Sequence, residues 1–516
     1  MKSQTEQKPK ISTNGDAFAK SRISLKTNGK SNGHKSNGIL KKPKWIYSKS
    51  IEDPKHIKLK SEYDLYIGGK WVKTKKYFES INPSNEEVIA KVAYASNEDV
   101  NKAVNAAEKA YHKIWSKISA KDRGKYIFRV ARIIQEKARE FAIIESMDGG
   151  KPIRESKTVD VPLALAHFFY YAGWADKLDY AFPKRKVSSI GVAGQIIPWN
   201  FPLLMAAWKI APALACGNTV VIKSAETTPL SLYKLAEVFE EAGLPEGVVN
   251  IISGDGATGA AIVKHPKTMK IAFTGSTEVG KIIMRQVAGT DKKLTLELGG
   301  KAANIIFEDA PLDAAVEGII SGIFFNQGHV CCAGSRLLVQ ESVKDLVIKK
   351  LKHRMNSLRV GDPLDKNTDV GAINSKIQLN RIRDLVDIGI NEGATIFQSD
   401  CELPKRGYWF RPTFFSDVAQ SHRIANEEIF GPVLSILTFR TPQEAVEKAN
   451  NTFYGLSAGV WTDKGSKIFK TLSNLRAGVV WSNTYNKFNP ASPFGGYKES
   501  GFGREGGRHG LEGYVR

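Results

Sequence analysis

The sequence predicts an α/β protein in which crossover helices cover a parallel sheet. Between residues 190 and 274, short apolar runs alternate with segments of helical periodicity, the order typical of βαβ units. A G-x-G-x-x-G turn at 254–259 follows one apolar run and precedes a helical segment, as in dinucleotide-binding folds. Hydrophobic residues make up 42 % and charged residues 25 % of the 516 residues, which is ordinary for a globular protein.

Residues 1–60 are expected to form a disordered basic tail. They contain 15 Lys and Arg against 4 Asp and Glu, which accounts for +11 of the total charge of +22. The polar run 27–38 has almost no apolar side chain whose burial could offset the entropy of ordering. A polybasic arm for an anionic partner, a dispensable extension and, more weakly, a transit peptide are the alternatives. The remaining chain is only mildly basic, so nucleic-acid binding is not expected.

Cysteine content and hydropathy bear on the location of the protein. Four cysteines in 516 residues are too few for a disulfide framework, which favours a reducing compartment. No stretch approaches 18 uncharged apolar residues, and the Lys-rich N-terminus lacks the apolar segment of a secretory signal. We therefore expect a cytoplasmic protein with no membrane partner.

The first elements after the tail are a hairpin and a long helical region. Residues 66–71 contain a Gly-Gly pair between strand-forming residues, which predicts a tight hairpin turn. Residues 97–146 carry apolar side chains at helical spacing. Asn97 is the predicted N-cap, because the two acidic residues that follow it are favourable against the helix dipole.

The region from residue 190 supplies the parallel sheet. Strands are predicted at 191–197, 218–223, 248–252 and 270–274, and helices at 206–215, 229–243 and 257–265. Strands connected through a helix lie parallel in one sheet. After about residue 298 a second set of alternating elements begins, which predicts a second α/β unit.

Two Gly-rich turns compete as a phosphate-binding site. The turn containing Gly256 fits the G-x-G-x-x-G pattern, whose glycines let a phosphate approach the backbone at a helix N-terminus. The turn containing Gly275 and Ser276 also joins a strand to a helix and offers N–H and hydroxyl groups. Either turn could instead be a plain connection between elements.

Three polar residues stand in positions suited to catalysis. Cys331 could be a nucleophile if a helix N-terminus lowers its pKa, although a lone Cys is more often a small buried hydrophobe. Glu297 ends an apolar strand, where apolar surroundings raise a carboxyl pKa and favour a general base, unless it pairs with Lys301 or another cation. Asn200 lies between prolines and aromatic residues, so its amide could donate to an oxyanion or shape a turn. No metal ligands are assigned.

Together these motifs resemble the NAD(P)-dependent aldehyde dehydrogenase superfamily over some 450 residues. The cysteine signature is Phe324-x-x-x-Gly328-x-x-Cys331, and the glutamate signature spans 296–301. Four further segments follow the family's order, at 198–202, 273–280, 427–432 and 493–498. The resemblance implies a Rossmann-type cofactor domain, an α/β catalytic domain and a small oligomerisation β element. The segments most similar to the family-16 branch are 148–155, 330–341 and 504–514.

The resemblance implies NAD-dependent oxidation of an aldehyde to a carboxylic acid. Cys331 would attack the carbonyl, and Asn200 with the Cys331 N–H would hold the oxyanion. Hydride would pass to the nicotinamide, and Glu297 would activate the water that hydrolyses the thioester. Phe488 matches an aromatic position of the substrate tunnel. His329 stands where the family usually has Gln or Glu, and packing beside Cys331 is favoured over an effect on the thiolate.

The resemblance also implies how the cofactor is bound. A carboxylate at Glu226 would accept from ribose hydroxyls and repel a 2′-phosphate, which favours NAD, with NADP still possible. The pyrophosphate turn would be the one at Gly275, which makes the G-x-G-x-x-G turn its neighbour. The residues expected to bind NAD are Trp199, Lys223, Glu226, Gly256, Gly275, Ser276, Gly280, Glu428 and Phe430.

Domains and assembly follow from the same resemblance. The expected parts are an NAD-binding domain at 61–170 and 190–298, a shortened oligomerisation hairpin at 171–189, a catalytic domain at 299–500 and a C-terminal segment at 501–516. Both elements that build the family's tetramer look reduced, so a homodimer is expected.

Two other functions remain open. A CoA-acylating aldehyde dehydrogenase would resolve the thioester with a thiol and would not need the carboxylate of Glu297. A catalytically idle scaffold would bind partners through the basic tail. The presence of Cys331, Glu297 and Asn200 together argues against the scaffold.

Overall fold

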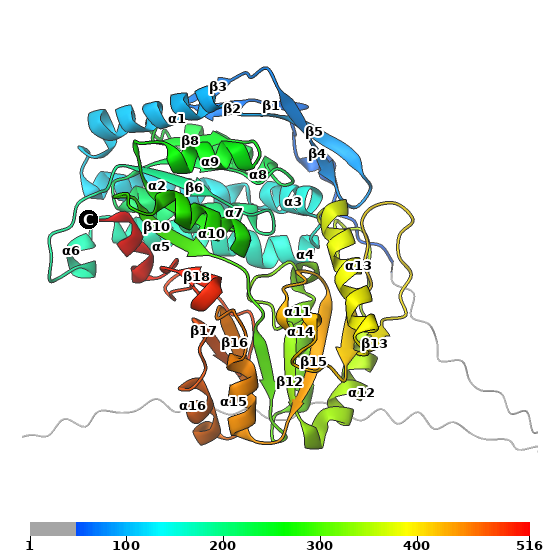
Figure 1. Ribbon diagram of the computed structural model, residues 1–516. Coiled ribbons are helices and arrows are strands. Elements are labelled where there is room, and N and C mark those ends of the chain that lie inside the picture. The colour runs from blue at the N-terminus through cyan, green and yellow to red at the C-terminus, as the bar shows by residue number, and fades with distance from the viewer. Residues whose placement is uncertain (1–47) are drawn as a thin grey trace, which may run out of the picture. The chain divides into compact units, whose positions relative to one another are not determined.

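The structure is a computed structural model and describes residues 48–516 (Figure 1). The part of the tail prediction that concerns residues 1–47 lies outside the described residues. Residues 48–60 correct that prediction, because they are ordered: Glu52 is 3 % exposed and accepts from Arg139 Nε at 2.6 Å. A buried, paired carboxylate orders this segment although it has few apolar side chains.

Eight strands form the first sheet, in the order β18-β10-β9-β6-β7-β8-β2-β3. The five strands from β10 to β8 run parallel, and β18 and β2 pair with them antiparallel. Their bounds are β2 Leu65–Ile67, β3 Lys70–Val72, β6 Val192–Ile196, β7 Thr219–Lys223, β8 Val249–Ile252, β9 Thr268–Thr274, β10 Lys293–Glu297 and β18 Gly501–Phe502. The predicted parallel sheet is therefore confirmed, and β18 joins it from the far end of the chain (Figure 1).

The hairpin at the other edge of this sheet is also confirmed. Strands β2 and β3 pair antiparallel around Gly68 and Gly69, whose φ angles are 63° and 76°. A two-residue turn with both central residues in the left-handed region matches the twist of the strands it joins.

The helices of this part lie between and after the strands. Their bounds are α1 Asn97–Ala110, α2 Ala120–Glu136, α3 Ala138–Gly149, α4 Ile153–Glu155, α5 Val161–Trp174, α6 Leu178–Ala181, α7 Pro202–Ala215, α8 Leu230–Glu241, α9 Gly256–Lys264 and α10 Thr277–Val287. The predicted N-cap of α1 is wrong by one residue, because Ser96 caps the helix and Asn97 is its first residue. Asp99 N–H donates to Ser96 Oγ and Ser96 N–H donates to Asp99, a reciprocal capping box.

Seven strands form the second sheet, in the order β13-β14-β15-β12-β11-β16-β17, all parallel except β13. Their bounds are β11 Ala303–Ile306, β12 Arg336–Gln340, β13 Thr395–Gln398, β14 Thr413–Ser416, β15 Val433–Phe439, β16 Ser457–Trp461 and β17 Val479–Ser482. The connecting helices are α11 Leu312–Ile323, α12 Lys344–Met355, α13 Lys376–Asn391, α14 Arg423–Asn426, α15 Pro442–Asn450 and α16 Gly465–Leu472. A separate small sheet pairs β1 Glu62–Tyr63 with β5 Glu87–Ala93 and β5 with β4 Tyr77–Asn82.

The span 171–189 does not contain the hairpin that was expected there. It holds the end of α5, the short helix α6 and an extended segment that ends in a β-bridge between Ser189 and Val515. Pro183 lacks an N–H to donate to a strand partner, and the following basic residues are exposed. Only the last residues of the span therefore pair, and they pair with the chain's own C-terminal segment.

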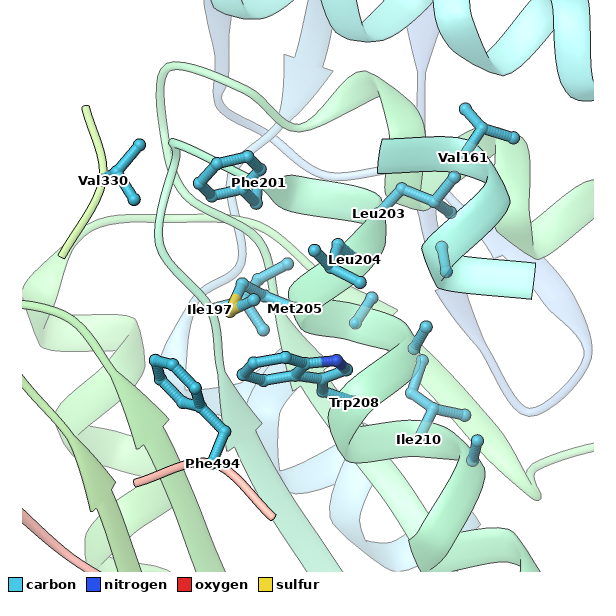
Figure 2. Close-up of a cluster of buried hydrophobic side chains, with 14 of the residues drawn as sticks. Val161, Ile197, Phe201, Leu203, Leu204, Met205, Trp208, Ile210, Val330 and Phe494 are labelled. Atoms are coloured by element: carbon cyan, nitrogen blue, oxygen red, sulfur yellow. The ribbon is translucent and has the colours of Figure 1, made fainter. Parts of the chain in front are cut away.

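Helix α7 is the centre of the apolar core beside the first sheet. Every one of its residues is buried, and it packs against α2, α5, α8 and β7. Figure 2 shows Leu204, Met205 and Trp208 of this helix beside Phe494 from the C-terminal region. This face of α7 forms one wall of the site described next. Within residues 48–516, no helix combines the length and the apolar character needed to cross a bilayer.

Candidate active site

A cavity of about 270 Å³ brings together most of the residues predicted to be functional. It opens where the carboxyl ends of β9 and β10 meet the segments that precede β12 and β15. The predicted residues that line it are Trp199, Asn200, Gly275, Ser276, Glu297, Cys331, Glu428, Phe430 and Phe488. Lys223, Glu226, Gly256 and Gly280 do not line it.

The parallel sheet places the turn at Gly275 next to Glu297. Strands β9 and β10 are neighbours, so their carboxyl ends lie at the same edge, and Gly275 N–H donates to Glu297 O at 3.1 Å. The Glu297 carboxyl at the end of β10 therefore shares a cavity with the N-terminus of α10, the helix that follows β9.

Cys331 follows a short segment of left-handed backbone. Asn326, Gln327 and Gly328 have φ angles of 48°, 53° and 77°. Asn326 Nδ2 donates to the backbone oxygen of Asn200 at 2.9 Å, and a Cβ at Gly328 would collide with the carbonyl oxygen of Gly431. Buried side chains therefore maintain a strained conformation, which is typical of functional segments. Sequence reasoning assigned no role to Asn326 and Gln327, although two amides between an apolar run and a cysteine were a visible signal.

The Cys331 thiol is not at a helix N-terminus, which corrects the predicted cause of its activation. It lies in a turn before β12. A hydrogen bond with the Cys332 thiol, together with burial, raises the pKa of Cys331 well above its usual value. The resting side chain is therefore a protonated thiol.

Glu297 is a buried carboxyl with no hydrogen-bond partner for either oxygen among the described residues. Burial raises the pKa of Glu297 well above its usual value, and the charge of Glu505 raises it further. The alternative pairing with Lys301 is not seen, because Lys301 Nζ likewise has no hydrogen-bond partner in this part of the chain. A raised carboxyl pKa in apolar surroundings is the state expected of a general base.

The Asn200 amide is held rigidly beside Cys331. Asn200 is 6 % exposed, and its Nδ2 donates to the backbone oxygen of His329 at 2.8 Å. An amide nitrogen carries two N–H groups, so the second remains available to an acceptor in the cavity.

The structure distinguishes the two Gly-rich turns. At the start of α9, the Asp255 carboxylate accepts from Ala257 N at 2.8 Å, so a negative charge already occupies this helix N-terminus. At the start of α10, the cap is the neutral Ser276, whose hydroxyl accepts from Val279 N at 3.3 Å. Only the second turn opens into the cavity, so it is the better anion site.

The remaining predicted residues lie beside the cavity. Lys223 is 4 % exposed, ends β7 and donates to Glu226 at 3.1 Å, while the Glu226 carboxylate is half exposed. Such an exposed carboxylate next to a lysine fits a ribose with free hydroxyls. Gly256 is the exposed first residue of α9, and Gly280 is buried against Leu298, which gives it a packing role.

Glu428, Phe430 and Trp199 line another part of the cavity, and His329 packs against the Phe430 and Trp199 rings. Glu428 accepts from Gly300 N–H at 2.9 Å, and burial raises the pKa of Glu428 to about 7. The His329 ring is stacked on Phe430 at 5.9 Å and lies edge-on to Trp199 at 4.8 Å. Burial lowers the pKa of His329 to about 3, so this imidazole is neutral and packs as favoured from the sequence.

Comparison with known proteins agrees with this geometry. Residues 71–516 match the sequence model of the aldehyde dehydrogenase family. The chain belongs to the aldehyde dehydrogenase family. The predicted family and enzyme class are thereby confirmed.

The similarity to individual members covers nearly the whole length. An aldehyde dehydrogenase of Alternaria alternata is 44 % identical over 481 residues, 91 % of this chain and 97 % of that protein. Human retinal dehydrogenase 2 is 46 % identical over 465 residues, 87 % of this chain and 90 % of that protein. Among solved structures, the NAD+ complex of an aldehyde dehydrogenase from Bacillus cereus superposes with a TM-score of 0.86 at 43 % identity, over 88 % of this chain and 95 % of that one. The predicted fold is confirmed by this similarity.

Proposed function

We propose that this chain oxidises an aldehyde to a carboxylic acid with NAD, through a thioester on Cys331. The observation that carries the proposal is the shared cavity of Cys331, Asn200 and Glu297, with the N-terminus of α10 opening into it. The relatives named aldehyde dehydrogenase and retinal dehydrogenase, and the NAD+ complex of a neighbour, support both the reaction and the cofactor.

The first step forms a bond between the Cys331 sulfur and the carbonyl carbon. Attack needs the thiolate, so the thiol proton must first pass from the sulfur to water. The carbonyl electron pair then moves to oxygen, where the free N–H of Asn200 and the N–H of Cys331 stabilise the negative charge. When bound, NAD accepts the hydride, and the collapsing oxyanion leaves a thioester on Cys331.

Glu297 completes the reaction as general base. Its unpartnered oxygens face no competing donor, so they can take a proton from a water that attacks the thioester carbon. The carbon–sulfur bond breaks, the carboxylic acid leaves, and the Cys331 thiolate is regenerated. A thiol in place of water would give the CoA-acylating reaction, which has no use for this carboxyl.

The residues beside the cavity support NAD over NADP. The half-exposed carboxylate of Glu226 would accept from the adenosine ribose hydroxyls and repel a 2′-phosphate. Ser276 and the free N–H groups of α10 would hold the pyrophosphate, and Glu428 the nicotinamide ribose. Replacement of Glu226 by Gln should raise the use of NADP relative to NAD.

The test follows NADH absorbance with a panel of aldehydes for the wild type, Cys331→Ala and Glu297→Gln. We expect no turnover by Cys331→Ala, and one burst of NADH per active site by Glu297→Gln, with slow turnover afterwards. Melting temperatures close to the wild type's would show that both variants fold. No turnover by the wild type with NAD, NADP or added CoA would contradict the proposal and favour the scaffold.

Finer assignments are proposed on the same basis. We place the chain in the family-16 branch on its motifs, and we assign NAD binding to 61–170 and 190–298 and catalysis to 299–500.

Four free cysteines support a cytoplasmic location. A homodimer is supported by α10, on which Val279 and Ile282 lie one turn apart and are 42 % and 47 % exposed, since an exposed apolar face on a helix favours burial against a partner.

A further inference from the structure

A buried histidine holds an indole that lines the cavity. Trp208 on α7 lines the cavity, and its indole N–H donates to Nε2 of His167 on α5. His167 is 1 % exposed and Trp208 is 5 % exposed. In Figure 2 the indole nitrogen lies on the edge of Trp208 that points away from Phe494. The polar edge of this ring is therefore directed into the protein rather than toward a ligand.

His167 acts only as the acceptor of this hydrogen bond. Burial lowers the pKa of His167 to about 3, so the imidazole is neutral and carries one proton. Because Nε2 accepts from the indole, the proton is on Nδ1, for which no hydrogen-bond partner is found among the described residues. Burial of an imidazole N–H without a partner lowers the free energy of unfolding. Packing alone does not explain why the protein carries this cost.

On α5, on α7 with its N-cap, and in the segment after β17, the other side chains that line the cavity are apolar. They are Leu163, Phe201, Leu204, Met205, Phe488 and Phe494. The Trp208 ring lies 5.1 Å from Phe494, and Phe494 lies 6.0 Å from Phe488. The charged residues of the lining other than Glu297 are Glu278 on α10, Glu428, and Arg381, which donates to the backbone oxygen of Glu428 at 3.2 Å. They therefore lie beside the segments proposed to bind the cofactor.

We propose that His167 is a positioning residue that fixes Trp208 as an apolar wall, and that this wall selects an uncharged, apolar aldehyde. Among the residues of α7 that line the cavity, Trp208 alone carries a strong side-chain donor, and His167 withdraws that N–H from a polar substrate tail. A substrate with a carboxylate or ammonium at its far end would lose its hydration without gaining a partner. This inference rests on the proposed function, whose site it deepens.

The first experiment measures selectivity of the wild type. Hexanal and phenylacetaldehyde are compared with succinic semialdehyde and 4-aminobutanal, and we expect kcat/KM to be about 100-fold higher for the uncharged pair. Similar kcat/KM values for charged and uncharged aldehydes would overturn the selectivity.

The second experiment tests the role of His167 with the variants His167→Leu and His167→Gln. Acetaldehyde is the reference, because it has no chain to pack on the wall. In His167→Leu the indole N–H loses its acceptor. We therefore expect the ratio of kcat/KM for hexanal to kcat/KM for acetaldehyde to fall about fivefold or more. Most of this fall should come from a higher KM for hexanal. His167→Gln offers a carbonyl acceptor and should restore much of the ratio. The exposed His353→Leu is the matched control.

A third variant separates positioning from general loosening. Trp208→Phe removes the indole donor, so adding His167→Leu to it should change the ratio no further. An equal effect of His167→Leu with and without Trp208, or an equal rise in KM for acetaldehyde, would overturn the positioning role.

Binding distinguishes failure of this inference from failure of the proposed function. Hexanamide, an unreactive analogue, is titrated calorimetrically into the same variants, and its affinity should fall in His167→Leu and recover in His167→Gln. Absence of turnover by the wild type would contradict the proposed function alone. Equal hexanamide affinity in the wild type and His167→Leu would contradict the inference whether or not turnover is found.

Discussion

Glu428 and Glu297 are two buried carboxyls of one cavity whose surroundings differ. Glu428 accepts from Gly300 N–H and lies in the field of Lys301, and both stabilise its carboxylate against burial. Glu297 has no hydrogen-bond donor among the described residues, and the charge of Glu505 opposes its ionisation. Glu428 is therefore poised to ionise near neutrality, whereas the charged form of Glu297 lacks such support.

The state of Glu428 predicts how cofactor affinity depends on pH. Burial raises the pKa of Glu428 to about 7, so its carboxylate, the form that accepts from ribose hydroxyls, is populated as the pH rises through this value. We expect the Kd for NAD to fall about tenfold between pH 6 and pH 8. Fluorescence titration at several pH values measures it. Glu428→Gln should bind NAD weakly, with a Kd that does not change with pH. If the Kd of this variant depends on pH as in the wild type, another group is responsible.

His329 supports Phe430 rather than titrating. Its ring is stacked on Phe430, and burial lowers the pKa of His329 to about 3. His329→Gln should therefore raise the KM for NAD about two- to tenfold, because the ring contact is lost. His329→Phe keeps an aromatic ring and should stay close to the wild type. An equal rise in the KM for NAD in the two variants, measured at saturating aldehyde, would indicate a role for the imidazole nitrogens instead.

At the scale of elements, the left-handed segment 326–328 positions the nucleophile. Its φ angles are maintained by amide side chains that reach Asn200 and the backbone of Ala372. Helix and strand propensities cannot produce such a conformation, because it is unfavourable for residues with a Cβ.

Gly328→Ala tests how tightly this segment is constrained. The new methyl group would collide with Gly431 O, and its φ of 77° is unfavourable for alanine, so we expect the free energy of unfolding to fall by about 1–3 kcal/mol and activity to fall with it. Gly465→Ala is the control, since it lies in the first turn of α16 with no atom within 4 Å of a new Cβ. Urea denaturation measures both. Equal stability of the two variants would show that the segment can relax.

At the scale of the whole molecule, the apolar face of α10 predicts assembly. Ile282→Glu places a charge on this face, where Ile282 is 47 % exposed, and should convert a dimer into a monomer because burial of the charge is costly. Ile377→Glu is the control, because Ile377 is 84 % exposed on α13. Sedimentation equilibrium measures the mass of each. A dimer in both variants, or a monomeric wild type, would contradict the interface.

The stability of the whole molecule should also depend on Glu155. This buried carboxyl accepts from Asn326 N–H at 2.8 Å, and burial raises the pKa of Glu155 to about 8. The folded state therefore keeps a proton that the unfolded chain loses near pH 4.5, so this contribution to stability is lost as the pH rises from about 4.5 to 8.

Glu155→Gln keeps an acceptor for Asn326 and removes the titration. Relative to this variant, the free energy of unfolding of the wild type should fall by on the order of 1 kcal/mol or more between pH 5 and pH 8. Denaturant unfolding at both pH values measures the difference. Parallel profiles would show that the carboxyl does not change its proton affinity on folding.

The sequence by itself determined the order of strands and helices around the first sheet and the main residues of the site. Alternating apolar runs and Gly-rich turns are local signals, so β6, β7, β8 and β9 were found within two residues of their bounds. The motifs around Cys331, Glu297 and Asn200 are equally local, and the structure brings all three into one cavity.

Only the tertiary structure decided how these residues behave. The pKa direction of Glu297, the ordering of residues 48–60 and the bond between His167 and Trp208 all depend on groups far apart in sequence. Local pattern reports which side chains prefer burial. Such a pattern does not identify the partner that each side chain contacts. Burial with or without that partner determines the charge, the strain and the chemistry of a site.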